Sequence, residues 1–108
     1  MRSIICRFRD EAELFAQLNK RNDLNFLGEF QMPLGNAIEI TIMISSLRER
    51  CRLKMHAVER CAMAIDDGHV RGARLWNYTV RVADEDRVWL DAFLSKIRAT
   101  QTFSAQAA

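Results

Sequence analysis

Proline, cysteine and long apolar runs are all scarce in this sequence of 108 residues, and each scarcity excludes a class of protein. A single proline, beside 49% hydrophobic and 28% charged residues, excludes a disordered chain, a collagen-like repeat and a low-complexity linker. The longest apolar run, residues 38–44, is interrupted by Glu39 and Thr41, and no run approaches the roughly 20 residues that cross a bilayer. We therefore expect no membrane insertion, and the charged residues 1–10 do not form a signal peptide.

The three cysteines are too few and too widely spaced for a disulfide framework, which predicts a reduced, cytoplasmic protein. Cys51, His56 and Cys61 suggest a metal hypothesis. Their spacing places neighbours on opposite faces of a strand, however, and the sequence contains no C-x-x-C pair. We therefore expect no metal site.

Signatures of catalysis and of nucleic-acid binding are also missing. The sequence contains no G-x-S-x-G, H-E-x-x-H or phosphate-loop motif. The acidic pair Asp66-Asp67 is typical of a solvated turn. The formal net charge is only +2, from 16 basic and 14 acidic residues, so we see no strong basic stripe for a nucleic acid. The sequence predicts a protein that is not an enzyme and has no cofactor.

What the sequence does contain is a series of strand patterns. Apolar residues alternate with polar ones in segments 3–9, 37–44, 53–57 and 76–82. Residues 26–32 predict a further strand broken by Gly28, and residues 45–52 a charged connection. Residues 58–65 either continue the preceding strand past a bulge or begin the next one. Asp66-Asp67-Gly68 predicts a hairpin turn between the last two strands.

Helical patterns occur near both ends of the chain. Asp10, with Glu13 three residues later, has capping-box spacing and predicts a short helix over residues 11–18. Acidic residues 84–86 precede a helical apolar stripe, which comprises Trp89, Leu90, Phe93, Leu94 and Ile97. We expect a single domain over residues 1–98 and a flexible tail over residues 99–108. The predicted fold is mainly β with α: a small antiparallel β-barrel with a short N-terminal helix and a C-terminal helix over one opening.

This arrangement resembles the PilZ domain family of bacterial signalling proteins over about residues 3–98. Gly28-Glu29-Phe30 resembles the family's G-x-F strand, and residues 34–42, LGNAIEITI, resemble its L-G-x-x-V-x-L-x-L strand. Residues 53–60 lie where the family has its next barrel strand. Residues 76–82 and 84–94 resemble its last strand and the acidic start of its C-terminal helix. The opening segment 4–15, IICRFRDEAELF, resembles the start of the type IV pilus branch.

The resemblance implies cyclic di-GMP as a candidate ligand. Binding members of the family carry an R-x-x-x-R motif on an N-terminal arm, followed by a [D/N]-x-[S/A]-x-x-G motif. Only Met1-Arg2-Ser3 precedes the first expected strand, which is too short for such an arm. The second motif has a degenerate match in three residues, which are Asp23, Asn25 and Gly28.

A second set of candidate nucleotide-binding residues lies later in the chain. Arg48 and Arg52 have R-x-x-x-R spacing, and Arg50 lies between them. Guanidinium groups bind phosphates in a bidentate manner and stack on bases. The alternative is a solvated segment whose charges pair with their neighbours.

Three functions stay open. The first is a non-enzymatic PilZ-like signalling adaptor that acts through protein–protein contacts in cyclic di-GMP-related pathways of pilus, motility or virulence, with weak or no nucleotide binding. Trp76 and Trp89 are its candidate interface residues, although both side chains also suit a core. The second is a genuine cyclic di-GMP receptor with a non-standard arginine site. The third is a small barrel that binds single-stranded nucleic acid, against which the strand faces show no alternation of exposed aromatic and basic residues.

Overall fold

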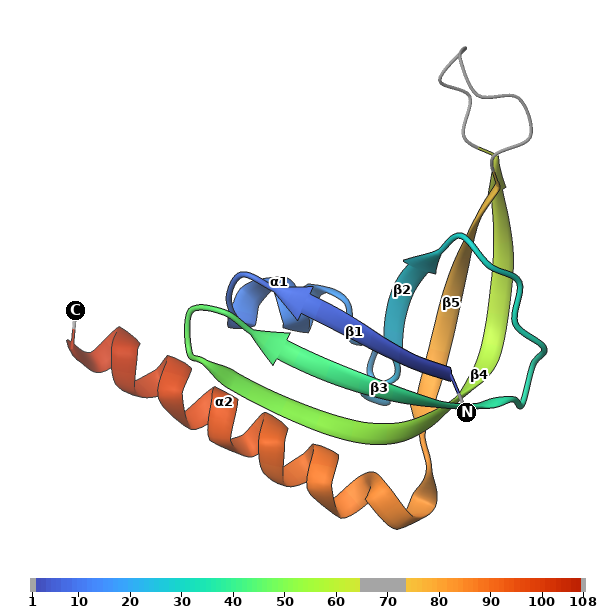
Figure 1. Cartoon of the computed structure of the whole chain (residues 1–108). Helices are drawn as coiled ribbons and strands as arrows, with labels where there is room; N and C mark the ends of the chain where they lie inside the picture. Colours follow the sequence, from blue (N-terminus) through green and yellow to red (C-terminus); the bar gives the residue numbers. More distant parts are fainter. Residues whose placement is uncertain (1, 65–73, 108) are drawn as a thin grey trace.

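The computed structural model describes residues 2–64 and 74–107 (Figure 1). The helices and strands follow in the order β1 (Arg2–Phe8), α1 (Glu11–Ala16), β2 (Leu24–Gly28), β3 (Ala37–Ile44), β4 (Glu49–Ala64), β5 (Arg74–Val82), the 3-10 turn η1 (Asp84–Asp86) and α2 (Arg87–Ala107). Among the described residues, the strands form one five-stranded sheet in the order β1-β3-β4-β5-β2. The sheet curls into a half-barrel, with β1 and β2 as its edges. The expected class, mainly β with two helices in a small barrel-like fold, is confirmed.

The core lies on the concave side of the sheet, and β3 shows why. Its isoleucines alternate with polar or partly exposed residues, and the four that share one face are fully buried: Ile38, Ile40, Ile42 and Ile44. β4 runs antiparallel to β3 and adds Leu53, Met55 and Ala57 to the same side. α2 packs against β4 and buries Leu90, Leu94 and Ile97 in the same core. Every second side chain of the strands thus packs against the apolar stripe of the helix, whose residues recur with a period of 3.6, and together they form one apolar interior.

One pair of strands differs from the antiparallel arrangement that we expected. β1 runs parallel to β3, in a register from Arg2 opposite Ile38 to Phe8 opposite Ile44. Parallel neighbours need a long connection, and α1 and β2 supply it, because both lie between β1 and β3 in the sequence. The N-terminal strand therefore forms one edge of the sheet, and β2 forms the other.

β4 is longer than the patterns predicted. It continues as one strand to Ala64, with a register shift between Ala57 and Glu59, so the bulge alternative is confirmed. It also begins at Glu49, and only residues 45–48 of the expected charged connection form a turn. Arg50 and Arg52 of the remaining segment occupy the outer face of a strand whose Leu53 points inward. The hairpin turn predicted at Asp66-Asp67-Gly68 lies outside the described residues.

The other helix and strand boundaries can be compared with those that the sequence predicted, and local contacts explain where they differ. Asp10 caps α1 as predicted, since its Oδ1 accepts a 2.9 Å hydrogen bond from the Glu13 N–H. The strand expected over 26–32 is instead β2, because the backbone beyond Gly28 bonds elsewhere: the Tyr78 hydroxyl donates to the Phe30 carbonyl at 2.7 Å. At the other end, α2 continues to Ala107, through residues that we expected to form a tail. That segment holds alanine and glutamine and no glycine or proline that would end a helix.

Candidate functional site

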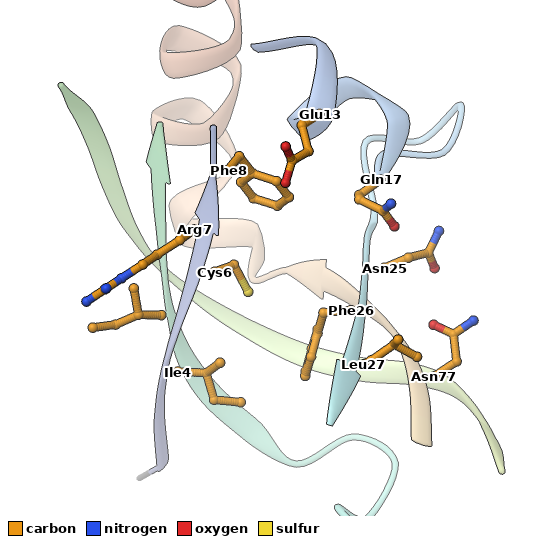
Figure 2. A pocket seen from close by; sticks show the side chains of 11 residues that line it. Ile4, Cys6, Arg7, Phe8, Glu13, Gln17, Asn25, Phe26, Leu27 and Asn77 are labelled. Atoms are coloured by element: carbon orange, nitrogen blue, oxygen red, sulfur yellow. The ribbon is translucent and has the colours of Figure 1, made fainter. Parts of the chain in front are cut away.

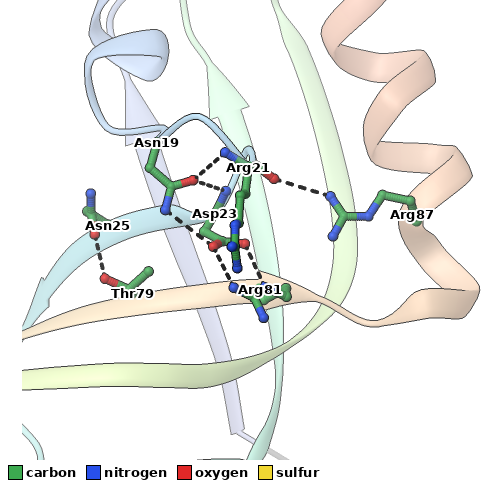
Figure 3. Close-up of polar contacts among 7 residues, drawn as sticks. All are labelled: Asn19, Arg21, Asp23, Asn25, Thr79, Arg81 and Arg87. Atoms are coloured by element: carbon green, nitrogen blue, oxygen red, sulfur yellow. Dashed lines mark hydrogen bonds and ion pairs between the residues drawn. The ribbon is translucent and has the colours of Figure 1, made fainter.

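The residues that match the degenerate nucleotide motif are engaged within the fold. Asp23, which directly precedes β2, is only 2% exposed. Arg81 of β5 holds its carboxylate in a bidentate pair, in which Nε and Nη2 each donate at 3.1 Å to a different oxygen (Figure 3). Asn19 donates to the same carboxylate from Nδ2 at 3.2 Å and accepts the Asp23 N–H at 3.0 Å. Asp23 therefore fixes the start of β2 onto β5.

The electrostatics around Asp23 favour its charged form. Burial acts to raise the pKa of this carboxyl group. The hydrogen bonds from Arg81 and Asn19, together with the charges of Arg81 and Arg87, outweigh burial and hold the pKa below its usual range. The Asp23 carboxylate already accepts hydrogen bonds from Arg81 and Asn19, so little of its hydrogen-bonding capacity is left for a ligand.

The other two residues of the motif are also structural. The Asn25 side-chain oxygen accepts a 2.8 Å hydrogen bond from the Thr79 hydroxyl, and its backbone N–H donates to the Gln17 carbonyl at 2.9 Å. Gly28 ends β2 beneath two aromatic rings, and a Cβ added there would lie 3.4 Å from Phe30 and 3.5 Å from Tyr78. These are ordinary van der Waals distances, so Gly28 lies against the aromatic side chains of the fold but is not required for their packing.

Two of the three candidate arginines lie side by side. Arg50 and Arg52 are two residues apart on β4 and therefore share its outer face, where they lie opposite Met43 and Thr41 of β3. Together with Thr41 they line a hollow of about 340 Å³. Within residues 2–64 and 74–107, neither guanidinium forms an ion pair with an acidic side chain. Arg48 is set apart from them in the turn before β4, where its backbone adopts a φ of +54°.

The arginines and the aspartate motif belong to separate surfaces. Along β4, Arg52 is seven residues from Glu59, which pairs with Thr79 beside Asn25. That spacing corresponds to roughly 23 Å of strand. The structure therefore does not bring the two halves of the expected nucleotide site together.

The two edge strands line a groove that the sequence did not reveal, and we call it the seam. It lies between β1 and β2, has a volume of about 680 Å³ and is closed at one end by Glu13 and Gln17. Figure 2 shows Ile4 and Cys6 of β1 pointing into the gap, toward Phe26 of β2. The sequence held one clue, the alternation in residues 3–9, but not the fact that this face is only partly covered.

The seam is lined by both apolar and polar side chains, with apolar surface in the majority, and it holds no reactive thiolate. Burial raises the pKa of the Cys6 thiol to about 11, so this group is neutral near pH 7. The apolar side chains on the inner face of β1 are Ile4, Cys6 and Phe8, of which only Phe8 is buried. Apolar side chains that stay partly uncovered are typical of a contact surface.

The two tryptophans have different environments. Trp76 is partly buried against the core, and the Arg60 guanidinium lies 5.6 Å from its ring centroid. Trp89 was expected on the buried stripe of the C-terminal helix, but it is 63% exposed beside the exposed Val88. A helix turns by about 100° per residue, so Trp89 points away from the core that its neighbour Leu90 enters. Trp89 is thus available at the surface.

The described part of the chain contains no cluster of three or more side chains that could hold a metal ion. None of the helices described is long and apolar enough to cross a membrane. No protein-family model matches the sequence, and no curated protein matches it.

Proposed function

We propose that this protein is a non-enzymatic, PilZ-like adaptor domain. It acts in the cytoplasm through protein–protein contacts, in bacterial cyclic di-GMP-related control of pili, motility or virulence. The observation that carries the proposal is the seam, a mainly apolar groove flanked by two sheet edges, with Leu27 exposed at its rim. Surfaces of this kind are typical of protein contacts.

The proposal includes weak or no binding of cyclic di-GMP. The motif residues that would meet the nucleotide, Asp23 and Asn25, already have partners inside the fold. The arginine hollow lies on another part of the sheet. Each charge-assisted contact with phosphate that is forgone removes roughly 1.5–3 kcal/mol of binding free energy.

Titration with cyclic di-GMP tests this part of the proposal. An adaptor predicts no heat of binding, and no change in melting temperature at about 100 µM nucleotide. Saturable heat with a low-micromolar Kd would contradict it. An oligothymidylate titrated in the same way tests single-stranded nucleic acid, whose binding would weaken steeply with salt.

A receptor function is the second candidate, and the hollow between Arg50 and Arg52 favours it. If the nucleotide binds there, Arg52→Ala should weaken binding by tenfold or more, since a guanidinium–phosphate contact is lost. Arg9→Ala removes the same charge from an exposed position paired with Glu13, so it serves as the matched control and should leave binding unchanged.

A photo-crosslinking amino acid placed in the seam tests the adaptor function directly. Leu27 lies at the rim of the seam and is 56% exposed, whereas Leu34 lies outside it and is 54% exposed. We expect a discrete crosslinked protein in bacterial cells from position 27 and none from position 34. Equal products from both positions, or none from either, would contradict a contact at the seam.

A further inference from the structure

The β1 edge of the seam carries backbone groups without partners. The Phe8 carbonyl accepts a 2.9 Å hydrogen bond from the Ser45 N–H, which continues the ladder to β3. Backbone N–H and C=O groups alternate between the two edges of a strand. Ser3, Ile5 and Arg7 therefore direct theirs toward the free edge, where no backbone hydrogen bond from the described part of the chain reaches them.

The β2 edge is better protected. Its Asn25 N–H is already bonded to the Gln17 carbonyl at 2.9 Å. By the same alternation, the Asn25 carbonyl and the two backbone groups of Leu27 are the groups of β2 that still face the seam. A free edge with several unpaired donors and acceptors is a template for another strand, and β1 is the edge that offers them.

The side chains beside this edge define what could pair with it. On the inner face, Ile4, Cys6 and Phe26 leave apolar surface partly uncovered (Figure 2). On the outer face, Ile5 is 55% exposed and Arg7 is exposed without an ion-pair partner among the described residues. A strand added to β1 would place alternate side chains on these two faces.

We infer that β1 binds an extended peptide segment of the partner by strand addition. The inward side chains of this segment are apolar and cover Ile4, Cys6 and Phe26. At least one outward side chain is acidic and lies across from Arg7, since opposite charges on neighbouring strands stabilise a sheet. The main-chain bonds form with Ser3, Ile5 and Arg7, as in other cases of strand addition. This inference rests on the proposed adaptor function and specifies the class of its partner.

The first test is an NMR titration of the ¹⁵N-labelled protein with a short synthetic peptide of alternating valine and glutamate. The amide signals of Ser3, Ile5 and Arg7 should shift saturably, because their N–H groups gain acceptors. A peptide of alternating valine and lysine should bind at least about threefold more weakly, because it faces Arg7 with like charge.

Two variants at one position separate main-chain from side-chain recognition. Ile5→Ala removes the outward side chain and keeps the N–H, so binding should change by no more than about twofold. Ile5→Pro removes the N–H that faces the free edge, which the fold itself does not use, and should weaken binding at least tenfold. If Ile5→Pro does not fold, a valine–glutamate peptide with N-methylated backbone replaces it and should not bind the wild-type protein.

The outcomes also separate this inference from the adaptor function. Equal binding to Ile5→Pro, equal binding of the N-methylated peptide, or no shift at all in β1 would overturn strand addition. If a protein is still crosslinked from position 27 in that case, the adaptor function stands and its partner uses another mode of contact. If the titration shows no binding and no protein is crosslinked, both the strand addition and the adaptor function are wrong.

Discussion

The ion pair between Asp23 and Arg81 gives the sharpest test of the fold, through the substitution Asp23→Asn. Asparagine keeps the shape of the side chain, but it cannot accept two charge-assisted hydrogen bonds from the guanidinium. Breaking a fully buried pair costs about 3–5 kcal/mol. Arg81 is 34% exposed in this pair and can be hydrated, so we discount that range to about 1.5–3 kcal/mol of unfolding free energy. The melting temperature should fall by about 7–13 °C.

The same pair predicts how the loss depends on pH. The pKa of Asp23 in the folded protein lies below its ordinary value of 3.8. A depressed carboxyl pKa contributes stability that is complete above the unfolded-state pKa and is lost as the pH falls through the folded-state pKa. The difference between wild type and Asp23→Asn should therefore be full at pH 7 and shrink below about pH 4.

Urea unfolding at pH 7 and at about pH 2.5 measures both effects. Glu13→Gln breaks the exposed pair with Arg9 and is the control, because exposed pairs contribute little to stability. A loss below about 0.5 kcal/mol for Asp23→Asn at pH 7 would refute the structural role of the pair. An equal loss at both pH values would refute the linkage to its charge.

Three further predictions concern local contacts. Tyr78→Phe deletes a buried hydroxyl that bonds two backbone groups of the loop after β2, so urea unfolding should show a loss of about 2 kcal/mol. Asp10→Ala removes the N-cap of α1 and should cost about 1 kcal/mol, measured in the same way. A thiol reagent at pH 8, with the modified sites located by mass spectrometry, should label the exposed Cys61 well before Cys6, whose pKa is raised to about 11 by burial.

Features that depend on local order were predictable from the sequence. The four alternating isoleucines of β3 and the cap formed by Asp10 lie where the patterns placed them. Both follow from periods and spacings of a few residues, which do not depend on the rest of the chain.

Features that depend on distant pairing were not predictable. Nothing near Asp23 in the sequence indicates that a residue 58 positions later, Arg81, binds its carboxylate. The parallel pairing of β1 with β3 likewise depends on the order of strands in the sheet. The seam follows from that order together with the curl of the sheet. The order makes β1 and β2 the two edges, and the curl turns these edges toward each other (Figure 1). The prediction that Trp89 belongs to the buried stripe of the C-terminal helix was also wrong. Its apolar character alone did not reveal that it points away from the core.

The pairing of β2 with β5 has a consequence for how the protein is made. Leu24 and Phe26 of β2 find their strand partners, Val80 and Tyr78, only after more than 50 further residues have been synthesised. β1 must likewise wait for β3. A sheet with such distant partners is expected to fold slowly, because long loops must close before their contacts form. On the ribosome, β1 should thus stay without its partner until β3 has emerged, and β2 until β5 has emerged. This interval is when a chaperone would be most useful.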